Sequence, residues 1–136
     1  LADLPMAMTA HVVFSAIDPA QPATTSATMI EQVIRGLIGF QGLLMSDDVS
    51  MNALAGSIAE RTEAIVAAGC DVVLHCNGNL EEMRAVARAT PLLTGRAAER
   101  AAAALAARAV PHAGFDRAAA RAQLDELVSR AGEIGA

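Results

Sequence analysis

The chain has 136 residues, of which 54% are hydrophobic, and its 10 Lys or Arg and 15 Asp or Glu residues give a formal net charge of −5. An acidic chain with 2% aromatic residues lacks the clustered cations and stacking platforms with which proteins bind nucleic acid, so we expect no such partner. No apolar run approaches the roughly 18 residues of a membrane span, so we expect no membrane segment and take the cytoplasm as the default location.

The chain begins with a predicted strand and helix. Residues 6–14 are strongly apolar and end in Val-Val-Phe, which favours a buried strand, and a Pro-containing loop over 18–22 follows. Ser26 can cap a helix whose apolar residues recur at three- and four-residue spacing as far as Leu37. Gly39 is expected to end this helix.

The second strand and second helix follow directly. Residues 43–45 form a short apolar run typical of a strand buried on both faces, and 47–56 form the loop after it. The helix after this loop begins at Ser57, because Ser57 and Glu60 have the spacing of a capping box. Gly69 is expected to end it.

The last predicted strand covers residues 72–74. Asn79 then caps a helix that runs to Ala89, with Glu82 at the position of the reciprocal capping residue. Sparse Leu among Ala, Arg and Glu predicts two further helices, over 96–109 and 116–131.

Strands and helices therefore alternate three times without a hairpin signal. This order predicts three successive parallel βα units within one α/β domain. The spacing alone fits part of a (β/α)8 barrel and half of a doubly wound sheet equally well. The cysteines on either side of the third strand, Cys70 and Cys76, are expected about 20 Å apart and reduced, since a disulfide requires roughly 7 Å or less.

The most informative stretch is residues 42–51, where Gly and three apolar residues lead into Ser46, Asp47 and Asp48. It resembles the active-site signature of glycoside hydrolase family 3. The segments 4–14 and 68–74 extend the resemblance to one branch of that family, the bacterial β-N-acetylglucosaminidases of cell-wall recycling.

The resemblance implies a fold and a domain organisation. The three βα units would be the last three of a (β/α)8 TIM barrel, followed by C-terminal helices. Residues 1–110 would form the C-terminal part of the barrel domain, and 111–136 a helical tail. A complete barrel needs roughly 250 residues, and the chain begins with Leu1, so we expect the remainder of the barrel upstream in a longer parent chain.

The resemblance also implies an enzyme, a retaining glycosidase that releases terminal β-linked N-acetylglucosamine without a cofactor. Asp47 would be the nucleophile that forms a covalent glycosyl-enzyme. Hydroxyls such as those of Ser46 and Ser50 would keep Asp47 ionised, and Asp48 would support the loop. His75 and Met51 are candidate sugar contacts. The general acid/base of this branch lies upstream of the segment, so the 136-residue chain alone is expected to be inactive.

Other interpretations remain open. The signature also fits β-glucosidases and β-xylosidases of the same family, and a non-catalytic α/β module is a further alternative. A receiver domain requires a Lys after a later strand, and the chain has none. A hydrogen-bonded structural role competes with substrate binding for His75 and His11, and core packing competes for Met51. No His, Cys or acidic residues have metal-ligand spacing, so we expect no metal.

Overall fold

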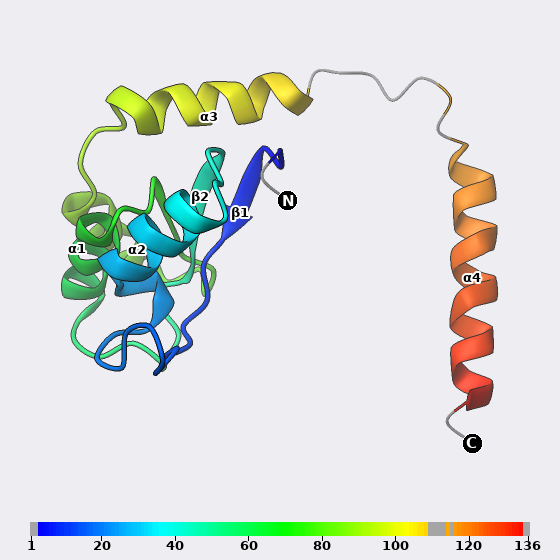
Figure 1. Cartoon of the computed structure of the whole chain (residues 1–136), viewed down its shortest axis with the longest axis horizontal. Coiled ribbons are helices and arrows are strands. Elements are labelled where there is room, and N and C mark those ends of the chain that lie inside the picture. Colours follow the sequence, from blue (N-terminus) through cyan, green and yellow to red (C-terminus); the bar gives the residue numbers. More distant parts are fainter. Residues whose placement is uncertain (1–2, 109–113, 115, 135–136) are drawn as a thin grey trace.

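The computed structural model describes residues 3–108, 114 and 116–134. Three parallel strands form one sheet in the order β1-β2-β3. Helices follow each strand (Figure 1). The elements are β1 Met6–Met8, η1 Ala23–Thr25, η2 Met29–Leu37, β2 Leu43–Asp48, α1 Ile58–Ala68, β3 Val72–Leu74, α2 Leu80–Ala89, α3 Gly95–Arg108 and α4 Arg117–Ile134. The predicted α/β class and parallel order are confirmed, whereas the boundary expected at 110/111 lies outside the described residues.

Two predicted strand lengths are wrong. The first strand ends at Met8 instead of residue 14, and residues 12–14 are irregular and about half exposed. Beyond β1 the backbone pairs with the segment that leads into η1 instead of with β2, as in the 2.8 Å hydrogen bond from Ala23 N to Val12 O. The second strand extends to Asp48, so Asp47 and Asp48 belong to β2 and not to the following loop.

The helices agree more closely with the sequence. Ser57 and Glu60 form the predicted capping box of α1, and Gly69 ends this helix with a left-handed φ of 107°. Asn79 caps α2 as expected, but Glu82 does not bond back to it. The helix predicted after Ser26 is present as η2, in which wider i→i+5 turns replace the α-helical pattern, as in the bond from Ile38 N to Val33 O.

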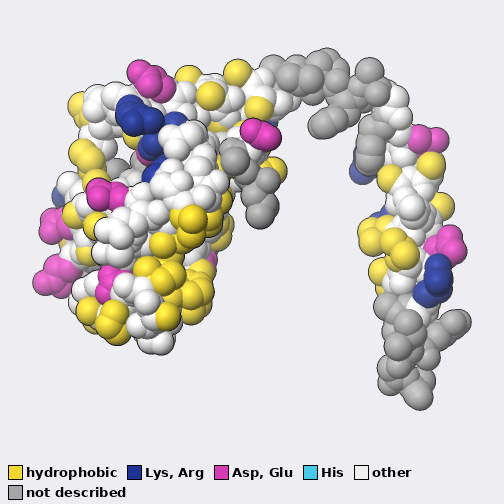
Figure 2. Space-filling model, viewed as in Figure 1, with side chains coloured by type: hydrophobic (Ala, Val, Ile, Leu, Met, Phe, Trp, Pro, Cys, Tyr) yellow, Lys and Arg dark blue, Asp and Glu magenta, His cyan; other side chains and the backbone are white. Residues whose placement is uncertain are grey.

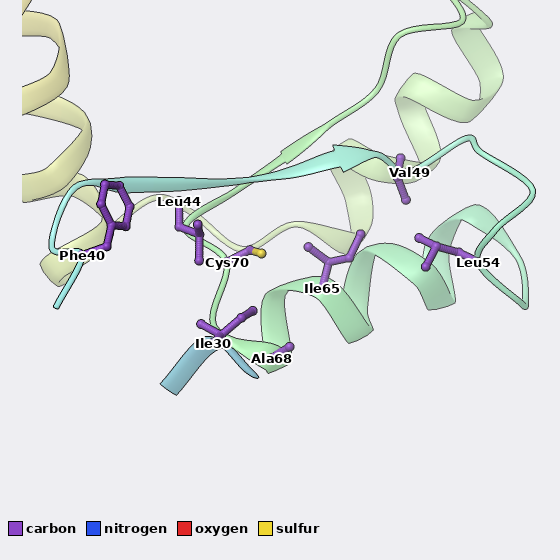
Figure 3. Close-up of a cluster of buried hydrophobic side chains, with 8 residues drawn as sticks. All are labelled: Ile30, Phe40, Leu44, Val49, Leu54, Ile65, Ala68 and Cys70. Atoms are coloured by element: carbon purple, nitrogen blue, oxygen red, sulfur yellow. The ribbon is translucent and has the colours of Figure 1, made fainter. Parts of the chain in front are cut away.

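The core lies between the sheet and the helices (Figure 3). Leu44 from β2 and Ile65 from α1 are each no more than 1% exposed and face one another across this layer. Val49 and Leu54 continue the core under the loop after β2. The complete buried cluster is Ile30, Phe40, Leu44, Val49, Leu54, Ile65, Ala68 and Cys70. The end of β2 that contains Asp47 and Asp48 is therefore supported by packed core residues.

An ionic network closes the amino end of the sheet. The Asp71 carboxylate, 5% exposed, accepts hydrogen bonds from Arg35 Nη2 and Arg100 Nη1, each at 2.8 Å. It also accepts a 2.8 Å bond from the backbone N–H of Leu44. Arg35 reaches on to the carbonyl of Gly42 at 2.7 Å. One carboxylate thus joins η2, α3 and the starts of β2 and β3.

Apolar side chains also gather on the outside, on the side of the body where β1 and η2 lie (Figure 2). Exposed members of this apolar face are Met8, Phe14, Ile17 and Ile38, which line one pocket. α4 stands apart from the body in Figure 1 and carries exposed Leu124, Leu127 and Val128. Among the described residues, no helix combines the length and the apolar character that crossing a membrane requires.

Candidate active site

The candidate site is the rim formed where the parallel strands end. Asp47 and Asp48 complete β2, and His75 follows β3. Because the strands are parallel, these residues meet at one edge of the sheet, the position at which α/β enzymes hold their reacting groups. Successive side chains of an extended strand point to opposite faces, so Asp47 and Asp48 lie on different faces of the sheet.

Asp48 is fully engaged within the protein. Its Oδ1 accepts hydrogen bonds from the backbone N–H groups of Ser50 at 3.0 Å and Cys76 at 3.1 Å. Its Oδ2 accepts from Ser50 Oγ at 2.7 Å. Burial raises the pKa of Asp48, but the hydrogen bonds from Ser50 and Cys76 outweigh it, and the pKa lies below its usual value. Asp48 thus ties the turn after β2 to the end of β3.

Asp47 has a different environment. Its Oδ1 accepts a 2.8 Å hydrogen bond from the backbone N–H of Asp48. No other group within the described residues donates to this carboxylate. Strand alternation puts Asp47 on the side of β2 away from Leu44, and Leu44 packs on the helices. One oxygen of the Asp47 carboxylate is thus oriented by the backbone, and the other has no protein donor in the described part of the chain.

The serine hydroxyls do not serve Asp47 as the sequence suggested. Ser46 is fully buried, and its Oγ accepts a 3.0 Å hydrogen bond from the backbone N–H of Leu74. The register between β2 and β3 shifts at this point, so the side chain supplies a bond that the backbone ladder lacks. Ser50 binds Asp48 instead. Both hydroxyls therefore position the strand end rather than the expected nucleophile.

His75 lies at the rim but is mostly covered, with 6% of its side chain exposed. Its Nε2 is 3.0 Å from Glu82 Oε2, and Asn77 Nδ2 donates to the same oxygen at 2.6 Å. The hydrogen bond from His75, followed by that from Asn77, lowers the pKa of Glu82. Glu82 therefore bonds to His75 and Asn77 instead of forming the predicted reciprocal capping bond to Asn79. The buried Nδ1 of His75 has no protein partner among the described residues.

His11 lies across β2 from His75, and it follows β1 instead of lying within that strand as predicted. Its Nε2 is 2.9 Å from the carbonyl oxygen of Asp48, and its Nδ1 is 2.9 Å from Thr24 Oγ1. A carbonyl can only accept, so Nε2 is the donor to Asp48, and with the proton on Nε2 the other ring nitrogen can accept from Thr24. Thr9 Oγ1 donates in turn to Thr24 at 2.9 Å.

Sequence reasoning missed Arg61, which reaches from α1 under the loop after β2. Its Nη1 donates to the carbonyls of Val49 at 3.2 Å and Met51 at 3.1 Å, and its Nε donates to Gly56 at 3.0 Å. The available signal was an Arg in the first turns of a helix whose preceding loop leaves many carbonyls to satisfy.

Two further rim residues are more exposed. Met51 is 43% exposed at the loop after β2, so its side chain is available to a ligand, as the sequence interpretation requires. Cys76 is exposed and unpaired, and Cys70 is buried and unpaired, which confirms that they do not form a disulfide. Within the described part of the chain, no cluster of three His, Cys, Asp or Glu side chains could hold a metal ion.

Comparison with known proteins identifies the family. The profile described as "Glycosyl hydrolase family 3 N terminal domain" matches residues 2–121. The chain belongs to glycosyl hydrolase family 3. It is similar to a β-hexosaminidase of Alkalilimnicola ehrlichii, with 48% identity over 90 residues, 65% of this chain and 25% of the relative. A β-hexosaminidase of Xanthomonas campestris pv. campestris is 46% identical over 87 residues, 61% of this chain and 26% of the relative.

Solved structures of family 3 proteins resemble the fold. A β-N-acetylhexosaminidase from Beutenbergia cavernae matches with a TM-score of 0.61 and 32% identity over 79% of this chain and 34% of that chain. A family 3 β-N-acetylglucosaminidase from Paenibacillus matches with a TM-score of 0.67 and 28% identity over 84% of this chain and 24% of that chain. This family 3 chain thus spans about a quarter of the length of the curated relatives it matches.

Proposed function

We propose that this family 3 chain is the nucleophile-bearing segment of a retaining β-N-acetylglucosaminidase. Asp47 attacks the anomeric carbon and forms a glycosyl-aspartate, while the glycosidic C–O bond breaks and the upstream acid/base group protonates the departing oxygen. The same group then takes a proton from the water that hydrolyses the glycosyl-aspartate, with overall retention of the β configuration. The substrate is a terminal N-acetylglucosaminide, in the first instance from peptidoglycan fragments in the cytoplasm. The names of the two β-hexosaminidase relatives support this substrate class.

The observation that carries the assignment is the contrast between two adjacent carboxylates. Both oxygens of Asp48 accept hydrogen bonds, three in total, which tie this carboxylate to the turn at Ser50 and to Cys76. Asp47 has one oxygen oriented by the next backbone N–H and the other without a protein donor in the described residues. Asp47 is therefore the carboxylate poised to attack.

The same proposal includes the remainder of the barrel. The three parallel strands would be the last three of eight, residues 1–110 the barrel part and 111–136 the tail. The free edge of β1 and the apolar face beside it support this, since an upstream strand and helix would cover both. The upstream segment would also supply the acid/base group. We call this chain joined to that preceding segment the completed barrel.

The test is steady-state hydrolysis of an aryl β-N-acetylglucosaminide by the completed barrel and two variants. Asp47→Ala should lower kcat by several orders of magnitude, since the covalent route is lost. Asp48→Asn should lower it far less, because the amide oxygen can still accept from Ser50 N and Cys76 N. Near-normal turnover by the Asp47 variant would refute the assignment.

Two further measurements define the reaction. Proton NMR of the first-formed product should show the β-anomer, and an initial α-anomer would mean that Asp47 activates water instead. Preferred hydrolysis of aryl β-glucosides or β-xylosides would keep the mechanism but change the substrate. If the completed barrel folds but cleaves none of these glycosides, the non-catalytic module becomes the better interpretation.

A further inference from the structure

We infer that His11 and Arg61 are positioning residues that hold the backbone after Asp47 from two sides and so set the attack geometry of its carboxylate. The inference rests on the proposed role of Asp47. Neither side chain hydrogen-bonds to that carboxylate. The sequence did not indicate that either residue would position Asp47. Both donate to backbone carbonyls within four residues of Asp47.

The first support is how Asp47 itself is oriented. Its Oδ1 is held by the backbone N–H of Asp48 and by no side chain in the described structure. The direction of the carboxylate consequently depends on the orientation of that one peptide group. A rotation of the backbone at Asp48 would swing the hydrogen bond away and release the carboxylate.

The second support is that the pairing of this backbone within the sheet is irregular. The register between β2 and β3 shifts between Met45 and Asp48, and beyond the shift Val49 N donates to Leu74 O over 2.9 Å. Beyond it the chain enters a loop, seen in Figure 3 leaving β2 at Val49 and returning over α1. Loops of this kind are more mobile than the elements they connect.

The third support is that the two donors act on consecutive carbonyls. His11 Nε2 donates to Asp48 O at 2.9 Å, and Arg61 Nη1 donates to Val49 O at 3.2 Å and Met51 O at 3.1 Å. His11 comes from the segment after β1, whereas Arg61 comes from α1. The two peptide groups that follow Asp48 are thus restrained by separate elements of the fold.

Each donor is itself held in place. The His11 ring is held at Nδ1 by Thr24, which is fully buried and accepts in turn from Thr9. Arg61 has a third bond, from Nε to Gly56 O at 3.0 Å, at the far end of the loop. Such preorganised support is what keeps a reacting group within the narrow geometry that attack requires.

The experiment measures the covalent step directly in the completed barrel. A 5-fluoro glycosyl fluoride of N-acetylglucosamine traps the glycosyl-enzyme, and mass spectrometry then reports the rate at which the peptide containing Asp47 gains the sugar. Arg61→Met and His11→Leu remove the donors with little change in volume. Each should slow labelling at saturating reagent by about 10- to 100-fold, while the half-saturating concentration changes less than about threefold.

Conservative variants and a matched control separate positioning from folding. His11→Gln keeps an N–H near the position of Nε2 and should restore most of the labelling rate. Arg100→Met removes a comparable, mostly buried Arg at the opposite end of the sheet, where it binds Asp71. It should lower the melting temperature yet label at the wild-type rate wherever the protein is folded.

Three outcomes decide the matter. Slow labelling of folded Arg61→Met and His11→Leu, with His11→Gln restored, supports the inference. Wild-type labelling rates in both folded variants, with only reduced melting temperatures, would overturn it. Failure of the wild type to label at Asp47 would instead overturn the proposed function.

Discussion

Asp71 offers the sharpest test of how this sheet is held together. Asp71→Asn keeps the shape of the side chain but removes the charge that Arg35 and Arg100 share at 2.8 Å. Removing one partner of a buried ion pair typically costs ~3–5 kcal/mol. Arg35 retains the carbonyl of Gly42, and Arg100 is 16% exposed and can turn toward water, so we expect the lower end, about 3 kcal/mol.

The measurement is urea unfolding of the completed barrel, followed by far-UV circular dichroism. Asp125→Asn is the matched control, because it makes the same chemical change in an exposed pair with Arg121 on α4, where the acid is 59% exposed. That variant should lose only about 0.3–0.5 kcal/mol, the usual value of an i,i+4 pair. A loss below about 1 kcal/mol for Asp71→Asn, or one equal to the control, would refute the reasoning.

Three further predictions concern the isolated chain, its acid response and its thiols. The 136-residue chain alone should show no hydrolase activity and should self-associate through the apolar face on β1 and η2, which size-exclusion chromatography would detect; a monodisperse, cooperatively melting monomer would contradict this. The lowered pKa of Asp48 means that its hydrogen bonds stabilise the fold above the ordinary value of 3.8 and are lost as pH falls through the folded-state pKa. The stability difference between wild type and Asp48→Asn should therefore shrink in urea titrations below pH 3.8. Iodoacetamide should modify Cys76 and spare Cys70, whose pKa is raised to about 11 by burial, and mass spectrometry that found both modified in the native state would contradict the packing.

The sequence predicted best where one local interaction decides the structure. The capping box of Ser57 and Glu60 is such a case, because both partners lie within one turn of α1. The same pattern failed at Glu82, where a tertiary contact with His75 is available and competes for the carboxylate. Its outcome depended on where the end of β3 would lie, which spacing along the chain does not encode.

The candidate site divides in a similar way. Asp47 could be proposed as the nucleophile from the sequence because the family resemblance is concentrated in a contiguous signature at the end of one strand. The roles of Ser46 and Arg61 could not be predicted, because their partners are backbone groups of Leu74 and of the loop over 49–56. Backbone carbonyls and N–H groups occur at every position, so no residue pattern marks which of them will need a side-chain partner.

The network around Asp71 also has a consequence for engineering. It secures the fold at one end of the strands, while Asp47 stands at the other end. Substitutions that change reactivity at Asp47 leave this anchor intact, because none of its bonds involves the rim. We therefore expect that Asp47 can be replaced by another reacting group, such as Cys or Glu, with little change in the melting temperature of the completed barrel.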